Sequence, residues 1–334
     1  MKPLMTDTFP VYRDLTELLV SPRSHPDGTL AHVLATCAGY AYGDEQTVAM
    51  IMARMGLKDN RCQRIELSVD AMLIRATAFL VQSDDGRVAI LCFRGTGPTD
   101  LINWLVDLDI DPEKVPISFA DAKKEFEVHS GFYRNVRAIR PAIVGALQSA
   151  LAGDSLLRDD VRRPNSLEAL YLTGHSLGGA MATIMAIMLV TEKRYEDIAA
   201  KLKGTYTFGQ PMVGSPELAA ACDGHPTLGR DVIRYVYGND VIPQLPPAFA
   251  GEFAHFGAEY RHKGPRSGGR WVRSTQPTKQ LRQLLHLLSA PLAFFARQIR
   301  ATRDVKFRAS FYDHFPRRYI TALTPAGKST EFGD

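Results

Sequence analysis

The chain has 334 residues, of which 45% are hydrophobic and 23% are charged, an ordinary composition for a folded globular protein with a sizeable core. It contains no internal repeat, no low-complexity segment and no run approaching the roughly 18 apolar residues that span a bilayer. The net charge of +4 is uneven: residues 261–318 carry 14 Lys or Arg against 2 acids, a net +12, which indicates an anionic partner or surface for that segment.

The cysteines and the first residues of the chain indicate the cellular compartment in which the protein is expected. The first eight residues include an early acid and no continuous apolar core, so they do not resemble a secretory signal. We therefore expect a cytoplasmic or peripheral membrane protein without a disulfide framework, although export by a route lacking a cleavable signal is left open. No pair of cysteines has metal-ligand spacing, and Cys92, in an apparent core strand, is expected to be a buried thiol. The four are Cys37, Cys62, Cys92 and Cys222.

The first third of the chain is predicted to begin with a proline-interrupted, loosely ordered lead-in over residues 1–28. Residues 30–42 and 44–55 have helical spacing, with Asp44 as a plausible N-cap and Gly56 as a plausible stop. Residues 77–83 and 87–93 are strand-like runs joined by Asp-Asp-Gly, which predicts a β-hairpin.

A short apolar helix is predicted directly after this hairpin. Thr99 or Asp100 could cap it. Its apolar face would consist of Leu101, Ile102, Trp104, Leu105 and Leu108. Such a helix beside a Gly-rich strand end is either packed core or a cover over a site, and periodicity alone favours core.

Strands and helices alternate through the middle of the chain. An amphipathic helix is expected from about residue 133 to 152 and a buried helix over 177–191. Strands are expected over 168–173, 205–208 and 232–237, and residues 318–323 are a last strand-like run. The alternation predicts a mixed or parallel sheet flanked by helices.

The junction between the strand at 168–173 and the following helix reads Gly174-His175-Ser176-Leu177-Gly178. A strand that turns directly into a helix strains the middle residue and lifts its side chain clear of the sheet. Side chains at Gly174 and Gly178 would collide as the helix packs back on its strand. Ser176 is therefore a candidate nucleophile, and the N–H of Leu177, at the helix start, is a natural oxyanion donor.

A serine nucleophile requires a base and a group that orients the base. In folds that hold a nucleophilic serine at such a strand–helix turn, the acid and then the histidine come after the serine in the sequence. This order reduces the nine histidines of the chain to four candidates: His255, His262, His286 and His314. Asp240 follows the strand at 232–237, in the kind of loop where α/β sheets assemble their sites. The residues alone leave His255 and His314 near equal as the base.

Six ordered blocks strongly resemble the fungal-type, class 3 lipase family. They are Phe93-Arg-Gly-Thr96, His129-x-Gly-Phe132, Gly174-His-Ser-Leu-Gly-Gly-Ala180, Thr207-Phe-Gly-Gln-Pro-Met-Val-Gly214, Asn239-Asp-Val-Ile-Pro243 and Asp313-His314, spread over about residues 30–323. The resemblance implies an α/β-hydrolase fold with Ser176 as nucleophile, Asp240 as acid and His314 as base, while the histidine at 255 is structural. It implies that Thr96 and Leu177 form the oxyanion hole.

By the same resemblance, the helix holding Leu101, Ile102, Trp104 and Leu105 is a mobile lid, against the preference from periodicity. The family pattern is interrupted in two places. Extra residues follow Thr96, and the segment at about 261–311 is longer and more basic than in the fungal enzymes. Its apolar stripe with basic flanks over 279–308 fits either peripheral contact with an anionic membrane or a cap subdomain, and nucleic-acid binding is not expected.

We therefore expect a serine hydrolase of lipid esters, similar to triacylglycerol lipases, that needs no metal or organic cofactor. A phospholipase A1 acting on anionic phospholipids is the alternative within the enzyme class. A non-catalytic lipid-binding module is the alternative outside it. The catalytic domain is expected over residues 29–323, with a tail at 324–334.

Overall fold

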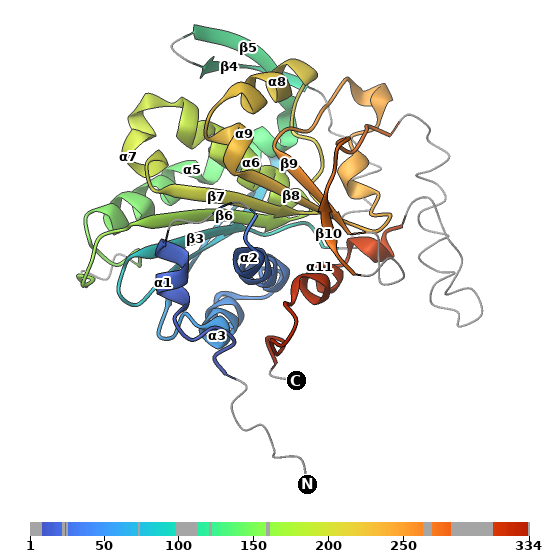
Figure 1. Ribbon diagram of the computed structural model, residues 1–334. Coiled ribbons are helices and arrows are strands. Elements are labelled where there is room, and N and C mark those ends of the chain that lie inside the picture. The colour runs from blue at the N-terminus through green and yellow to red at the C-terminus, as the bar shows by residue number, and fades with distance from the viewer. Residues whose placement is uncertain are drawn as a thin grey trace.

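The computed structural model describes residues 9–21, 24, 26–72, 74–97, 112–119, 122–157, 161–262, 269–281 and 310–332. An eight-stranded sheet lies at the centre, in the order β1-β2-β3-β6-β7-β8-β9-β10 (Figure 1). Its strands are β1 (Arg61–Val69), β2 (Ile74–Gln82), β3 (Val88–Phe93), β6 (Ala169–His175), β7 (Leu202–Phe208), β8 (Val232–Tyr237), β9 (Ala258–His262) and β10 (Trp271–Arg273). The run from β3 to β9 is parallel, and both edges are antiparallel. The prediction of a mostly parallel sheet flanked by helices is confirmed.

Helices cover both faces of the sheet (Figure 1). On one face lie α1 (Leu15–Val20), α2 (Gly28–Tyr40), α3 (Glu45–Met55) and α11 (Pro316–Leu323). On the other lie α5 (Ser130–Leu151), α6 (Leu177–Thr191), α7 (Glu196–Ala199), α8 (Pro216–Gly224) and α9 (Leu228–Asp231), with the hairpin β4 (Pro112–Phe119) and β5 (Ala122–His129). Short 3-10 turns are η1 (Asp70–Met72), η2 (Lys193–Tyr195), η3 (Ile242–Gln244), η4 (Ala248–Ala250) and η7 (Tyr312–His314).

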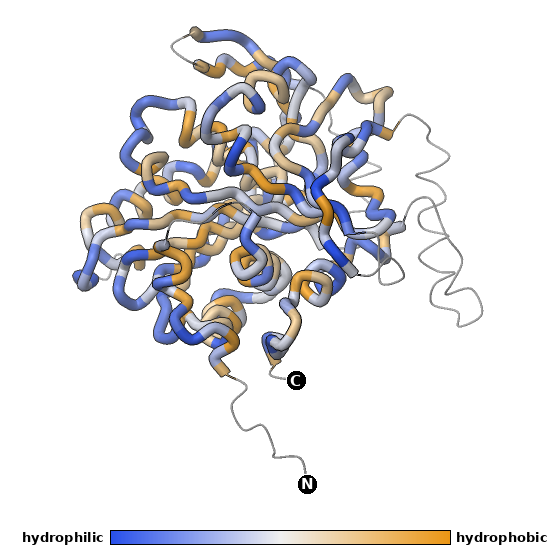
Figure 2. Tube along the Cα trace, viewed as in Figure 1, coloured by the Kyte–Doolittle hydropathy of each residue, from blue (hydrophilic) through white to orange (hydrophobic). Residues whose placement is uncertain are grey.

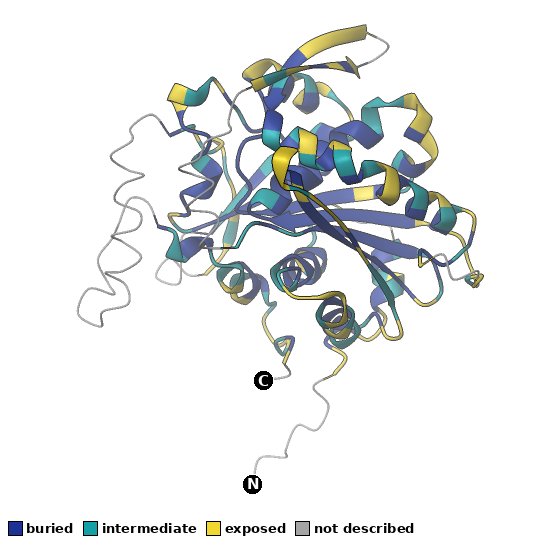
Figure 3. Ribbon diagram, turned by 180° about the vertical axis from the view of Figure 1, so that it is seen from behind, coloured by how far each residue is buried: buried dark blue, intermediate teal, exposed yellow. Residues whose placement is uncertain are grey.

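The sheet separates two hydrophobic cores, because successive side chains of a strand point to opposite faces. In β3, Ile90 and Cys92 pack toward α2, whereas Leu91 and Phe93 pack toward α5 and α6. Figure 2 shows the hydrophobic stretches gathered in and beside the sheet. From behind, the central strands are buried while exposed residues lie on the outer helices and on the β4–β5 hairpin (Figure 3).

Most predicted elements of the core are confirmed. Helix α6 spans the predicted residues, and β8 spans Val232–Tyr237 as expected. The Asp44 side chain accepts a hydrogen bond from Thr47 N at 2.8 Å, and Gly56 ends α3 with φ 135°. The predicted hairpin is formed by β2 and β3, which pair antiparallel. Strands β1, β4, β5, β9 and β10 were not predicted.

Two predictions about the ends of the domain are wrong. The lead-in is not loose throughout, since residues 15–20 form α1 and bury Leu15 and Leu19, spaced i and i+4, against the core. Residues 318–323, predicted as strand-like, belong to helix α11. Pro316 opens this helix at a position where its missing N–H costs nothing, and its buried residues lie on one face. None of the helices in the described part of the chain has the length and apolar character that a bilayer crossing requires.

Candidate active site

The loop between β6 and α6 holds Ser176 in a strained conformation, with φ 58° and ψ −131°. A positive φ in a non-glycine residue costs on the order of 1–3 kcal/mol and persists only where the surroundings impose it. Here the Ser176 N–H donates to the carbonyl of Phe208 on the neighbouring strand β7, at 2.9 Å. The strand–turn–helix geometry predicted for this motif is therefore present.

Two glycines permit this turn for the reason that the sequence predicts. A Cβ on Gly174 would lie 2.3 Å from the carbonyl carbon and oxygen of Gly178, closer than any real contact. A Cβ on Gly178 would lie 2.2 Å from the Phe93 carbonyl oxygen at the end of β3. The start of α6 thus packs with backbone contact on the ends of both β6 and β3.

The same close packing brings the two candidate oxyanion donors into one region. Thr96 follows Gly95, whose added Cβ would lie 2.6 Å from the carbonyl oxygen of His175. Leu177 is the first residue of α6, so its N–H has no acceptor within the helix. The segment after β3 therefore runs beside the serine turn, with Thr96 partly exposed.

Asp240 lies just beyond the end of β8 and is buried, and three hydrogen bonds from the described residues satisfy its carboxylate. Oδ1 accepts from the Ile242 N–H at 2.9 Å. Oδ2 accepts from Nδ1 of His314 at 2.8 Å and from the Tyr319 hydroxyl at 2.5 Å. The acid is thus fixed in place and bonded to one of the two competing histidines.

A set of contacts seats the backbone of His314. In the preceding residue, the Asp313 carboxylate accepts a hydrogen bond from Asn239 N at 3.0 Å, and Ser310 N donates to Asn239 O at 2.9 Å. The His314 carbonyl accepts from His175 Nε2 at 2.6 Å. The segment that carries His314 is therefore docked on the turn that carries Asp240.

His175, beside Ser176, is neutral and connects two parts of the site. Burial lowers the pKa of its imidazole well below the ordinary range, so the ring carries one proton. That proton lies on Nε2, which faces the His314 carbonyl, and Nδ1 accepts from the Tyr42 hydroxyl at 2.8 Å. The end of α2 thus supports the backbone of His314 through a buried imidazole.

Two polar atoms at this site have no hydrogen-bond partner in the described part of the chain: Ser176 Oγ and His314 Nε2, both buried. They lie around the same glycine. Ser176 bonds to Phe208, and the next residue, Gly209, would place a Cβ 2.7 Å from Asp240 Oδ2 and 2.9 Å from His314 Cε1. With Nδ1 bonded to the acid, Nε2 is the nitrogen of His314 that remains to accept a proton.

The competing histidine is occupied elsewhere. His255 Nε2 lies 2.7 Å from the carbonyl oxygen of Pro243, which makes that nitrogen a donor. Burial lowers the pKa of its ring to about 3. His262 stacks on Tyr237, and His286 lies outside the described residues. The geometry therefore distinguishes between two histidines that the sequence leaves near equal.

Several predicted residues lie outside the described part of the chain: Leu101, Ile102, Trp104, Leu105 and most of the basic segment. The ends of that segment are described. Leu281 N donates to Gln244 O at 2.8 Å, and the Leu281 carbonyl accepts from Ala248 N at 2.9 Å. With Ser310 bonded to Asn239, both ends are attached to the loop that begins at Asp240.

Sequence reasoning missed the contributions of Tyr319, Tyr42 and Gly209. Tyr319 was concealed by the wrong assignment of its segment, since on a strand it would not face β8 as it does from α11. Tyr42 gave no signal of its own, and Gly209 was noted only as a member of the Thr207–Gly214 block, because their contacts with the site are made only across the folded chain.

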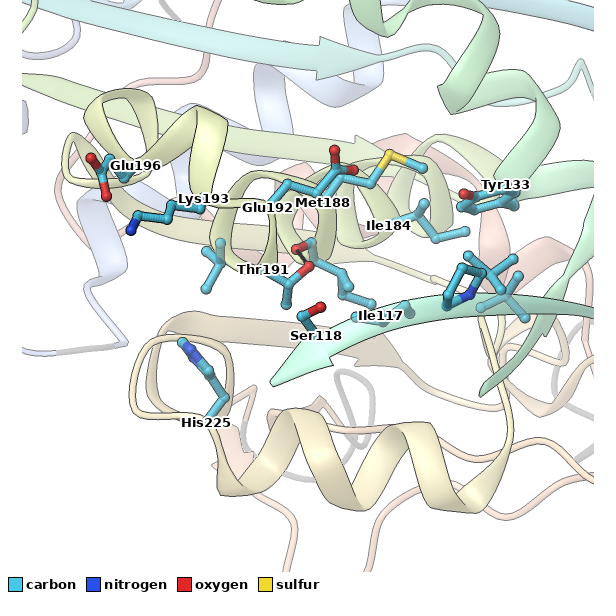
Figure 4. Close-up of a pocket in the computed structure, with 15 residues that line it drawn as sticks. Ile117, Ser118, Tyr133, Ile184, Met188, Thr191, Glu192, Lys193, Glu196 and His225 are labelled. Carbon is cyan, nitrogen blue, oxygen red and sulfur yellow. Dashed lines mark hydrogen bonds between the residues drawn. The ribbon is translucent and has the colours of Figure 1, made fainter. Parts of the chain in front are cut away.

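The cavity of about 580 Å³ shown in Figure 4 is separate from this site. It lies between the C-terminal half of α6, the β4 strand and the turn at His225, and Met188 is among its lining residues. Met188 is eleven residues beyond Leu177, which at 1.5 Å per residue is about 16 Å along the helix from the serine turn. Among the described residues, no group of His, Cys, Asp or Glu is placed to hold a metal ion.

Comparison with known proteins gives concordant matches. A family model described as class 3 lipase matches residues 90–250. Triacylglycerol lipase OBL1 of Ricinus communis is 30% identical in an alignment 214 residues long that covers 56% of this chain and 40% of that protein. A lipase of Rhizomucor miehei is 31% identical over 189 residues, 57% of this chain and 46% of that protein.

The solved structure of lipase II from Rhizopus niveus superposes with a TM-score of 0.56 at 21% identity, covering 76% of this chain and 86% of that one. This likeness shows the fold, and the predicted α/β-hydrolase fold is confirmed. This chain spans less than half the length of the two curated relatives.

Proposed function

We propose that this chain is a member of the class 3 lipase family, whose model matches residues 90–250, and that it hydrolyses carboxylic esters of lipids, as a triacylglycerol lipase does. The observation that carries the proposal is the arrangement around Gly209. The backbone of the strained Ser176 bonds to Phe208 directly before this glycine, and the imidazole of His314 lies beside it. Nδ1 of His314 is bonded to the buried Asp240 carboxylate, while Ser176 Oγ and His314 Nε2 have no hydrogen-bond partner among the described residues.

In the proposed reaction His314 Nε2 takes the Ser176 proton as Oγ attacks the acyl carbonyl, and Asp240 stabilises the imidazolium that forms. The Thr96 and Leu177 donors bind the oxyanion of the tetrahedral intermediate, and each such donor contributes roughly 3 to 4 kcal/mol in related acyl-transfer sites. The imidazolium then protonates the leaving alcohol. Water attacks the acyl-enzyme with His314 again as base, which releases the fatty acid.

Substitution of the nucleophile tests this proposal. Ser176→Ala should reduce hydrolysis of a p-nitrophenyl ester by at least about 10³-fold. Because the change removes one buried, unpartnered oxygen, the thermal unfolding midpoint should not fall. Turnover that is retained by a folded Ser176→Ala protein would refute the assignment.

A phospholipase A1 acting on anionic phospholipids is the second candidate, and one cluster favours it. Just after His314, the guanidinium groups of Arg317 and Arg318 lie 5.6 and 4.2 Å from the ring centroid of Tyr312. Within the described residues neither arginine has a carboxylate partner, and both lie in the first turn of α11, whose dipole also favours an anion.

The two candidates differ in the head group that they accept. Phosphatidylglycerol and triacylglycerol hydrolysis should be compared in wild type, in Arg317→Gln/Arg318→Gln and in the distant control Arg162→Gln. A phospholipase predicts that the double variant loses phosphatidylglycerol turnover selectively. Equal effects on both substrates would leave the triacylglycerol assignment standing. Liposome binding without ester turnover by the wild type would instead favour a non-catalytic module.

We also propose peripheral contact between residues 279–308 and an anionic membrane surface, on the basis of their basic and apolar sequence. We further propose that the catalytic domain covers residues 29–323 and extends toward the N-terminus to include α1. Neither the membrane contact nor the domain bounds affect the proposed chemistry.

A further inference from the structure

The loop that follows Asp240 contains an exposed apolar turn, residues 246–251, which we call the apolar tip. It includes η4 and belongs to a run from residue 241 to 251 without a charged side chain. Phe249 at its centre is 64% exposed, the highest fraction among the large hydrophobic side chains of the described residues. An exposed phenylalanine within an uncharged segment is a candidate contact for an apolar phase.

The apolar tip is held rigidly in this exposed arrangement. The Gln280 side-chain amide donates to the carbonyls of Pro246 at 2.9 Å and Gly251 at 2.8 Å, and its oxygen accepts from Phe253 N at 3.3 Å. Ala248 N donates to the Leu281 carbonyl. One glutamine therefore closes the base of the turn, and Phe249 is presented to solvent by a framework that leaves it outside the core.

The position of the apolar tip relates it to the candidate active site. Its loop begins at Asp240, beyond the carboxyl end of β8, and its base packs on Met212 and Phe253. Met212 N bonds to the Leu245 carbonyl at 2.8 Å, which ties the loop to the segment after β7 that contains Gly209. The tip thus lies at the same edge of the sheet as Ser176 and His314.

We propose that the apolar tip is a docking element that inserts Phe249 into the surface of a lipid aggregate and so brings the active site to its substrate phase. A lipid interior requires no directional hydrogen bonds, and the tip offers few because Gln280 occupies the carbonyls at its base. One phenylalanine flanked by two alanines is too small to form a stable protein–protein interface, which buries upwards of about 1,200 Å² in total. The exposed Lys279, next to Gln280, would meet anionic head groups at the same surface.

This inference rests on the proposed function only for the biological purpose of lipid binding, because binding itself can be measured in a variant that does not hydrolyse esters. In the Ser176→Ala background, partition onto vesicles of phosphatidylcholine with one fifth phosphatidylglycerol should be compared for Phe249, Phe249→Ala and Phe249→Asp. The matched control is Phe332→Ala, which removes a phenylalanine that is 59% exposed; it follows α11 in the chain, near the end marked C in Figure 1.

Burial of a side chain of this size and exposure predicts that Phe249→Ala weakens partition about 5- to 30-fold, that Phe249→Asp weakens it further, and that Phe332→Ala changes it less than about twofold. With Ser176 restored, Phe249→Ala, Phe249→Asp and Phe332→Ala should each hydrolyse a soluble short-chain ester at the wild-type rate. Equal partition of the Phe249 and Phe332 variants would overturn the proposal. So would a wild-type dimer in solution that Phe249→Asp dissociates, since the tip would then bind a second copy. Failure of the proposed function would appear separately, as absence of ester turnover in wild type.

Discussion

Replacing Tyr319 with phenylalanine removes one of the three hydrogen bonds that the described residues make to the Asp240 carboxylate. Burial raises the pKa of Tyr319 well above the ordinary value, so its hydroxyl is a donor at any working pH. A hydrogen bond to a charged group contributes about 1.5 to 3 kcal/mol, and the change also removes the hydroxyl that accepts from the Tyr237 N–H, at about 1 kcal/mol. We expect the free energy of unfolding to fall by about 2 to 4 kcal/mol.

The same change should lower kcat for a soluble ester. With one donor fewer, the Asp240 carboxylate that orients His314 is held less firmly. If a third to a half of the lost hydrogen bond, about 0.5 to 1.5 kcal/mol, is lost from the transition state, kcat falls about 2- to 10-fold, because about 1.4 kcal/mol corresponds to tenfold. The assay is kcat for a soluble ester at one fixed pH.

Tyr171→Phe is the control, since that hydroxyl is also buried but donates to the Leu19 carbonyl, at 2.6 Å, away from Asp240. It should lose stability and keep the wild-type kcat. If Tyr319→Phe loses stability while its kcat stays at the wild-type value, the hydroxyl only supports the fold and the reasoning is refuted.

Three further predictions follow from contacts and burial. His314→Ala should lower kcat by at least about 10³-fold, whereas His255→Ala should lose stability but keep most activity; an inactive His255 variant alone would reverse the assignment. Gly174→Ala should prevent folding to a soluble product, because the added Cβ would lie 2.3 Å from the backbone of Gly178. The control Gly224→Ala, whose added Cβ has no atom within 4 Å, should be neutral or should stabilise the protein by about 0.5 to 1 kcal/mol in thermal unfolding. Burial lowers the pKa of His32 to about 4, below the value of about 6.5 in the unfolded chain. The unfolded state therefore binds the extra proton, and stability is lost as the pH falls from 6.5 toward 4. In His32→Gln, the free energy of unfolding, measured with urea at each pH, should depend less steeply on pH, by up to about 1.4 kcal/mol per pH unit.

The parts of the fold that sequence predicted are those with local signals. Helix α6 is bounded by a glycine motif and filled by an almost wholly apolar run, so both its type and its limits could be read directly. Helix α11 could not, because its short run of tyrosine, isoleucine and threonine favours a strand locally. It is helical in the fold because Tyr319 and Ile320 pack on the sheet and α2, where Ile320 Cδ1 lies 2.7 Å from the Cβ position of Gly39.

The candidate site divides in the same way. The Ser176 motif is contiguous, and its strand–turn–helix context could be predicted from neighbouring residues. The choice between His255 and His314 could not, since both follow Asp240 and spacing says nothing about where each ring points. The contacts of Asp240 with His314 and of Pro243 with His255 exist only in three dimensions.

Leu281 and Ser310 flank residues 282–309, and each of the two is bonded to the stretch of chain around Asp240. A segment with both ends fixed close to one loop can grow at small entropic expense, about 0.6 kcal/mol for each doubling of its length. Evolution could therefore lengthen, shorten or recharge residues 282–309, and so change the membrane surface proposed as their partner, without retuning the proposed reaction chemistry.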